Sequence, residues 1–112
     1  MMKNHPLHIR IGFALAGLRQ CWRTESSFRT HVLASAAVLV ALIVLRPAPI
    51  WWAIILLVSM LVMAFEALNS ALERLIDHLH PEIHPEIGVV KDMAAGAVLL
   101  LSGGAILIAL CL

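Results

Sequence analysis

The chain alternates between long apolar runs and short polar breaks, and this pattern predicts four helices. Apolar residues recur at helical spacing over residues 7–27, between arginines, which is typical of an amphipathic helix lying on a membrane surface. Three more apolar segments follow, at residues 28–46, 50–79 and 91–112. A helix of about 20 residues crosses a hydrocarbon layer about 30 Å thick. We therefore expect an all-α integral membrane protein with three transmembrane helices and an N-terminal surface helix.

Prolines mark the breaks between these segments. Arg46-Pro47-Ala48-Pro49 should end the first span, because proline disfavours the helical conformation in the residue before it and lacks a backbone donor. Residues 80–87 read HPEI twice in tandem, so we expect residues 80–90 to form an exposed loop. The second span has no glycine or proline between residue 50 and Pro81, so its helix should continue beyond the membrane to residue 79.

Composition supports this interpretation. The 112 residues are 62% hydrophobic and 13% charged, with a mean hydropathy of +0.95. One compact globule of this size cannot hide so much apolar surface, so residues 1–112 are expected to form a single membrane domain. The net charge of +1 provides no basic stripe for nucleic acid, and no nucleic-acid partner is expected. Cys21 and Cys111 stand at opposite ends of the chain, without a metal or redox spacing.

The distribution of basic residues predicts the orientation in the membrane. No cleavable signal peptide is expected at the polar N-terminus. Five basic residues precede the first span, whereas the turn after it contains only Arg46; the five are Lys3, Arg10, Arg19, Arg23 and Arg29. Positive charge favours the cytoplasmic side, so the N-terminus and the loop of residues 80–90 should be cytoplasmic. The acidic residues then lie on the side of the membrane where ATP is found.

Four polar residues form a stripe along the second span and its extension. Spacings of three, four and four residues place them on one helix face: Glu66, Asn69, Glu73 and Asp77. Glu66 should lie roughly 24 Å into the span, near the inner edge of the membrane, where an ionisable residue is a functional candidate. Glu73 suits a Mg²⁺ ligand beside a lipid headgroup, and such a stripe can support phosphoryl transfer. The alternatives are a structural hydrogen bond at Glu66, a solvated acidic face, an ion path in a small transporter subunit, or a scaffold that oligomerises through glycines.

Two segments of this sequence together carry a family resemblance. Glu66-Ala-Leu-Asn69-Ser-Ala-Leu-Glu73, followed by Asp77 and by Lys91-Asp92-Met-Ala-Ala-Gly-Ala-Val98, resembles the characteristic motif of prokaryotic diacylglycerol kinases. The N-terminal segment is also similar to that family, at Gly17-Leu18-Arg19, Trp22, Glu25, Phe28 and Arg29. The chain has no Walker A loop, as this family has none. The resemblance implies an ATP-dependent, Mg²⁺-requiring lipid kinase of phospholipid metabolism, a homotrimer in the bacterial inner membrane with active sites between subunits.

The resemblance also implies roles for individual residues. Glu66 would be the general base toward the lipid hydroxyl, with Asn69 ordering the acidic site, and the metal ligands would be Glu25 and Glu73. Nucleotide and metal contacts together would come from Glu25, Glu73, Asp77, Glu82, His84, Lys91 and Asp92. For Asp92, a role as the N-cap of the third span is equally open, and Glu82 and His84 could instead belong to a proline-stiffened loop or a weak metal binder. Substrate contacts would come from Gly17, Arg19, Trp22, Phe28, Arg29, Glu66 and Ala95.

The sequence departs from the enterobacterial pattern of this family near its start. Arg10 is displaced relative to an expected nucleotide-contacting arginine, and His31 stands where that branch has an acidic residue. Phe28-Arg29-Thr30-His31 also resembles the branch that phosphorylates undecaprenol, a long polyprenyl alcohol. The expected reaction is phosphorylation of diacylglycerol to phosphatidic acid, with undecaprenol as the alternative acceptor.

Overall fold

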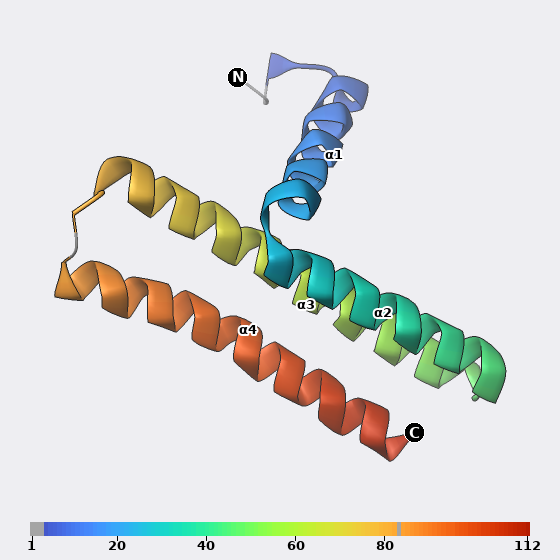
Figure 1. The fold of residues 1–112 in the computed structure, drawn as a ribbon. Coiled ribbons are helices and arrows are strands. Elements are labelled where there is room, and N and C mark those ends of the chain that lie inside the picture. The colour runs from blue at the N-terminus through green and yellow to red at the C-terminus, as the bar shows by residue number, and fades with distance from the viewer. Residues whose placement is uncertain (1–3, 83) are drawn as a thin grey trace.

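Four helices form the fold in the computed structural model, which describes residues 4–82 and 84–112 (Figure 1). They are α1 (Leu7–Thr24), α2 (Ser26–Leu45), α3 (Pro49–Leu79) and α4 (Pro85–Cys111), and the described residues contain no strand. The expected all-α class is confirmed. Lys3, one of the basic residues that predicted the orientation, lies outside the described residues.

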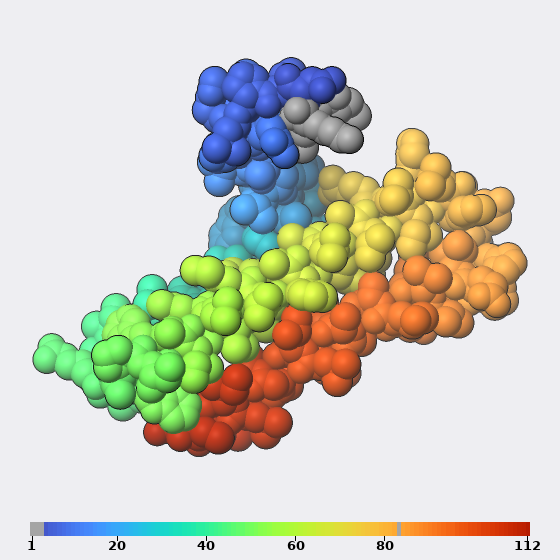
Figure 2. Space-filling model, turned by 180° about the vertical axis from the view of Figure 1, so that it is seen from behind, coloured from blue at the N-terminus to red at the C-terminus, as the bar shows by residue number. Residues whose placement is uncertain are grey.

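The helices α2, α3 and α4 are each long and apolar enough to cross a membrane, as the sequence predicted. They contain 20, 31 and 27 residues, and α3 packs against both α2 and α4. Only α1 departs from this bundle, and it joins α2 at a sharp angle (Figure 1). Seen from behind, α1 projects from the pair formed by α3 and α4 (Figure 2). This geometry fits an amphipathic helix that lies along the membrane surface while the other three cross it.

The turn between α2 and α3 is short because the chain stops the first helix abruptly. Arg46 adopts the left-handed conformation with φ 50°, and its backbone N–H donates to the Leu42 carbonyl oxygen at 2.9 Å. A left-handed residue of this kind commonly closes a helix C-terminus. Pro47 follows and cannot continue the helix, and Pro49 then occupies the first turn of α3, where a missing N–H costs nothing.

The start of α4 differs from the sequence prediction. The helix begins at Pro85, so the loop between α3 and α4 is residues 80–84, and Pro85-Glu86-Ile87 of the second HPEI repeat form the first helical turn. His84 is the N-cap, and its Nδ1 accepts a hydrogen bond from the Glu86 N–H at 3.1 Å. Proline is favoured at the first helical position because its φ is already helical. Asp92 therefore lies inside α4, and the interpretation of Asp92 as the N-cap of this span is wrong.

Few apolar side chains are enclosed by the fold. Among the described residues, the buried hydrophobic positions are Phe28, Leu42, Ile55, Val62 and Val98. They lie on the three spans, whereas α1 has no buried residue. Most large apolar side chains face outward, and they form a larger exposed apolar surface than soluble monomeric proteins have. Lipid or further protein must cover it, in agreement with a membrane protein.

Candidate functional site

The polar stripe on α3 passes from the protein interior to the surface. Glu66 and Ser70 are both only 6% exposed, Asn69 and Glu73 are half-buried, and Asp77 is exposed. The carboxylates therefore occupy different environments, although they share one helix face. A buried carboxylate is costly without a partner, and a half-buried one can still reach ions and water. Glu66 is accordingly the acid whose position most needs an explanation.

Glu66 has a partner on the neighbouring span. The His31 Nε2 of α2 lies 3.5 Å from the Glu66 Oε2 of α3, and the two side chains are 25% and 8% exposed. One helical turn before His31, Phe28 is buried in the interior. This contact places an imidazole beside the carboxylate for which the family resemblance implies a general-base role.

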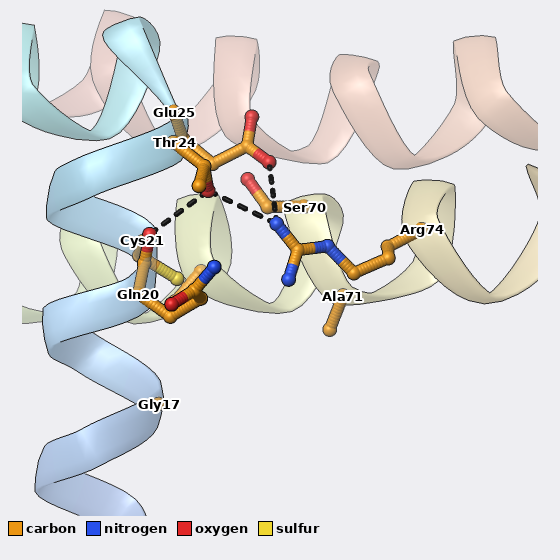
Figure 3. Close-up of a pocket in the computed structure, with 9 residues that line it drawn as sticks. Gly17, Gln20, Cys21, Thr24, Glu25, Ser70, Ala71 and Arg74 are labelled. Carbon is orange, nitrogen blue, oxygen red and sulfur yellow. Dashed lines mark hydrogen bonds and ion pairs between the residues drawn. The ribbon is translucent and has the colours of Figure 1, made fainter.

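A second group of polar residues lies where α1 meets α3 (Figure 3). Arg74 extends from α3, and its Nη2 donates to the Thr24 Oγ1 at 3.0 Å and lies 3.9 Å from the Glu25 Oε1. Thr24 in turn donates its hydroxyl to the Gln20 carbonyl oxygen at 2.8 Å. These residues border an open cleft of about 210 Å³, lined by Gly17, Gln20, Cys21, Thr24, Glu25, Ala67, Ser70, Ala71 and Arg74.

Burial and the neighbouring charges of this cleft change the pKa of the Cys21 thiol. Burial raises the pKa of Cys21 above its usual value, and the negative charges of Glu25 and Glu66 raise it further, whereas Arg74 lowers it. The thiol is therefore less ionised at neutral pH than an exposed cysteine. Cys21 thus experiences the charges of both the Glu25 and the Glu66 groups.

The junction between α1 and α2 is held by Arg29. Its Nη1 donates to the carbonyl oxygens of Trp22 at 2.7 Å and Arg23 at 3.2 Å, which are otherwise unpaired at the end of α1. Glu25 has an extended backbone at this break, with φ −113° and ψ 106°. Arg29 of α2 therefore binds the end of α1 through its guanidinium and holds the two helices together on either side of Glu25.

Lys91 and the 80–84 loop form a third polar group. The Lys91 Nζ of α4 forms an ion pair with the Asp77 Oδ1 of α3. Together with the loop they border a cleft of about 140 Å³, lined by Asp77, His80, Pro81, Glu82, His84, Ile87, Gly88 and Lys91. The structure thus brings together four of the residues predicted to contact nucleotide: Asp77, Glu82, His84 and Lys91.

A further cleft runs between the three spans beside His31. It has a volume of about 290 Å³ and is lined mostly by small residues: Thr30, His31, Ala34, Ser35, Val38, Ser59, Val62, Ser102, Ala105, Ile106 and Ala109. The Ser102 Oγ is buried and has no hydrogen-bond partner in the described part of the chain, and the same holds for the Asn69 Oδ1 on α3. Buried polar atoms of this kind are free to bind a ligand or a second chain.

The remaining predicted residues lie apart from these clefts. Arg19, Trp22, Asp92 and Ala95 are exposed and line none of the clefts described above. Sequence reasoning had not placed Arg74, Thr24 or Ser70 in the site. Arg74 follows Glu73 directly, and a cation beside an acidic stripe was the available signal. No sequence signal distinguished Thr24 or Ser70, because their roles depend on how α1 approaches α3.

The metal ligands that the resemblance implies are two carboxylates, Glu25 at the break between α1 and α2 and Glu73 on α3. Across residues 4–82 and 84–112, no group of three or more His, Cys, Asp and Glu side chains could hold a metal ion together. Mg²⁺ is commonly held by only one or two carboxylates and completed by water and substrate phosphates. Glu25 and Glu73 supply the hard oxygen donors that this ion prefers, and the donor chemistry therefore fits.

Fold and site define a multi-pass helical membrane protein whose ionisable side chains gather around the C-terminal half of α3. Residues 12–112 match the family described as prokaryotic diacylglycerol kinase. The chain belongs to this family. The match includes α2, α3 and α4 entirely, together with most of α1.

Named relatives support this membership. A diacylglycerol kinase of Synechocystis is 36% identical over 107 residues, which cover 95% of this chain and 61% of the relative. A diacylglycerol kinase of Escherichia coli K12 is 35% identical over 96 residues, covering 80% and 73% of the two chains. An undecaprenol kinase of Bacillus subtilis is 33% identical over 82 residues, covering 73% and 67%. The chain thus spans less than two thirds of the Synechocystis relative.

Proposed function

We propose that this protein is an ATP-dependent lipid kinase that phosphorylates a membrane alcohol at the cytoplasmic edge of the bilayer. The observation that carries the proposal is the buried Glu66 carboxylate on a membrane-spanning helix, followed along one face by polar groups that reach the surface. An ionisable residue at such a position usually marks a site of function. Membership of the prokaryotic diacylglycerol kinase family supports the same conclusion.

Glu66 serves as the general base in this proposal. Its carboxylate takes the proton from the primary hydroxyl of the lipid, the hydroxyl oxygen attacks the γ-phosphorus of ATP, and ADP departs with the electrons of the broken bond. Because Glu66 is buried, little water reaches its carboxylate. The carboxylate therefore acts on the lipid hydroxyl and not on water. Asn69, half-buried one turn further along α3, offers its unpaired Oδ1 to order the acidic site.

Nucleotide is held by the polar groups nearer the cytoplasm. Lys91 can transfer from Asp77 to a phosphate oxygen, because its side chain is 33% exposed and lies beside the loop cleft. Glu82 and His84 border the same cleft, whereas Asp92 is placed one residue beyond Lys91 on α4. Glu25 and Glu73 would hold Mg²⁺, which neutralises phosphate charge when it is bound.

The acceptor that we propose is diacylglycerol, which would yield phosphatidic acid. Two of the named relatives are diacylglycerol kinases. Undecaprenol is the alternative, because another relative is an undecaprenol kinase and because the cleft of small residues lined by His31 offers an apolar chain a place between the spans. The substrate-binding roles proposed for Gly17, Arg19, Trp22, Phe28, Arg29 and Ala95 concern either lipid equally.

We further propose a homotrimer in the bacterial inner membrane with a cytoplasmic N-terminus. The uncovered apolar faces of the three spans leave room for partner chains as well as lipid. Within one chain, Glu25 reaches Arg74 of its own α3, and a shared active site would add contacts from Glu25 to a partner's acidic stripe. The basic residues of α1 support the orientation.

Phosphate transfer from ATP by the purified protein in mixed micelles tests this function. Diacylglycerol and undecaprenol are supplied separately, with Mg²⁺ or with EDTA, and Glu66→Gln is the control. Transfer that requires both Mg²⁺ and Glu66 is expected, and the preferred acceptor identifies the substrate. Failure of the folded protein to phosphorylate either lipid would contradict the proposal and favour the transporter alternative.

A further inference from the structure

The Glu66 carboxylate lies beside one ionisable side chain of the neighbouring span. Within the described residues, His31 is the only side chain that makes an ion pair or hydrogen bond with the Glu66 carboxylate, with 3.5 Å between Nε2 and Oε2. Removing a carboxylate from water is costly unless a donor or a positive charge faces it. The geometry therefore makes His31 the group that determines how this carboxylate is held.

Among the described residues that line the cleft with His31, no other side chain is charged. From α3, His31 meets Glu66, and the cleft that it lines adds only small, hydroxyl-bearing or apolar residues, including Ser35 of α2 and Ser102 of α4. Arg29 precedes it by two positions, but the Arg29 guanidinium is bonded to the end of α1. His31 and Glu66 thus meet beside an open cleft, while on the side of α1 the charges of Glu66, Glu25 and Arg74 all act on Cys21.

We propose that His31 is a positioning residue for the catalytic carboxylate, an inference that rests on the proposed kinase function. In the reacting complex the His31 Nε2–H would donate to the Glu66 Oε2, and Oε1 would remain to accept the proton of the lipid hydroxyl; in the structure the two atoms form an ion-pair contact. A distance of 3.5 Å is long for a hydrogen bond, and such contacts are often long before substrate binds and shorten in the reacting complex. His31 also lines the cleft between the three spans, so the imidazole connects this cleft to the Glu66 carboxylate.

A matched pair of variants separates this role from simple packing. Glutamine carries an amide donor near the position of the imidazole Nε2, whereas asparagine carries the same amide one carbon shorter and does not reach Glu66. His31→Leu removes the donor and keeps a similar volume. A hydrogen bond to a charged group contributes enough that its loss should reduce kcat roughly 10- to 100-fold.

The expected result is a loss of kcat in His31→Asn and His31→Leu, with the KM for the acceptor changed by less than about threefold. His31→Gln should retain a kcat within about threefold of the unmodified protein. ATP affinity and the thermal unfolding temperature in detergent establish that each variant is folded. Unchanged kcat in His31→Asn and His31→Leu would overturn the proposal, as would a loss in His31→Gln equal to that in His31→Asn.

A second measurement keeps this inference separate from the kinase proposal. The ¹⁵N resonance of the His31 Nε2 reports hydrogen bonding without any need for turnover, and Glu66→Leu should shift it while leaving the other histidines unchanged. If the unmodified protein is folded but phosphorylates no lipid, and Glu66→Leu still shifts the His31 resonance, the kinase function is contradicted and the His31–Glu66 contact is supported. If the unmodified protein is active and Glu66→Leu causes no shift, the His31–Glu66 contact is contradicted and the kinase function is supported.

Discussion

The Lys91 ammonium on α4 forms an ion pair with the Asp77 carboxylate on α3, at the end of the bundle where the 80–84 loop joins the two helices. The Asp77 side chain is 63% exposed and that of Lys91 is 33% exposed. Exposed pairs of this kind contribute little to stability, because water and salt screen them. The lysine can therefore exchange its partner for a phosphate group at little cost to the fold.

Replacing Lys91 by methionine should weaken ATP binding. Removal of a charged contact to phosphate is expected to raise the dissociation constant for ATP roughly 10- to 100-fold, with little change in thermal unfolding. Lys91→Arg retains a positive charge and should have a much smaller effect. Calorimetric titration of ATP into each protein measures the effect. Equal affinity in Lys91→Met would exclude Lys91 as a phosphate ligand.

Arg74 should compete with Mg²⁺ for Glu25. Its Nη2 lies 3.9 Å from the Glu25 Oε1, so metal binding at Glu25 must weaken this contact. Because an exposed pair is worth no more than about 1 kcal/mol, Arg74→Gln should lower the Mg²⁺ concentration for half-maximal activity by at most about fivefold. A Mg²⁺ titration of phosphate transfer measures this change, with Arg23→Gln as a control for charge on the nearby surface. A higher Mg²⁺ requirement in Arg74→Gln would instead indicate that Arg74 holds Glu25 in position for the metal.

The two native cysteines report the orientation in the membrane. Cys21 lies on α1 and Cys111 ends α4, so three crossings place them on opposite sides. In right-side-out vesicles, an impermeant maleimide should label the Cys21→Ser variant through Cys111, whereas the Cys111→Ser variant should be labelled only after the vesicles are opened. Labelling of both variants in sealed vesicles would contradict a cytoplasmic N-terminus.

The rate of Cys21 labelling should also depend on pH. Burial and the charge of Glu25 raise the pKa of this thiol, so less thiolate is present at neutral pH than for an ordinary cysteine. Labelling of Cys21 in opened vesicles should therefore increase with pH into a more alkaline range than labelling of free N-acetylcysteine. Equal pH dependence of Cys21 and N-acetylcysteine would contradict the enclosed environment described for Cys21.

A shared active site predicts complementation between inactive chains. If Glu25 of one subunit acts with Glu66 of another, co-expressed Glu25→Gln and Glu66→Gln chains should form some trimers with one complete site. Separate preparations of each variant should be inactive, and the mixed trimers should regain a fraction of the activity. Absence of any recovery, with mixed trimers demonstrated by differential tags, would place each site within a single chain.

The helices and the acidic stripe were predictable because each depends on local spacing. Hydrophobic runs fixed three of the four helices, and the intervals between Glu66, Glu73 and Asp77 placed these acids on one face whatever their tertiary contacts. The start of α4 was predicted incorrectly, because proline was interpreted as a helix breaker at Pro85. The same residue is favourable at a first helical position once His84 supplies the cap.

The polar contacts of the site were beyond sequence reasoning because they join residues far apart in the chain. Thr24 and Arg74 are separated by fifty positions and meet only because the C-terminal end of α1 lies against α3. His31 was noticed as a substitution, but its proximity to Glu66 depends on the rotation of α2 against α3. Periodicity predicts which face of a helix is apolar, but not which residue of a neighbouring helix that face meets.

The most direct test of the central claim compares ATP binding with phosphate transfer in Glu66→Gln. The buried carboxylate is proposed to act on the lipid hydroxyl, so the variant should bind MgATP with an affinity within about threefold of the unmodified protein. Its rate of lipid phosphorylation should fall by about 10² or more, the usual range for loss of a general base. A folded Glu66→Gln protein that phosphorylates lipid at the rate of the unmodified protein would contradict the account, because the buried acid would then have no part in the chemistry.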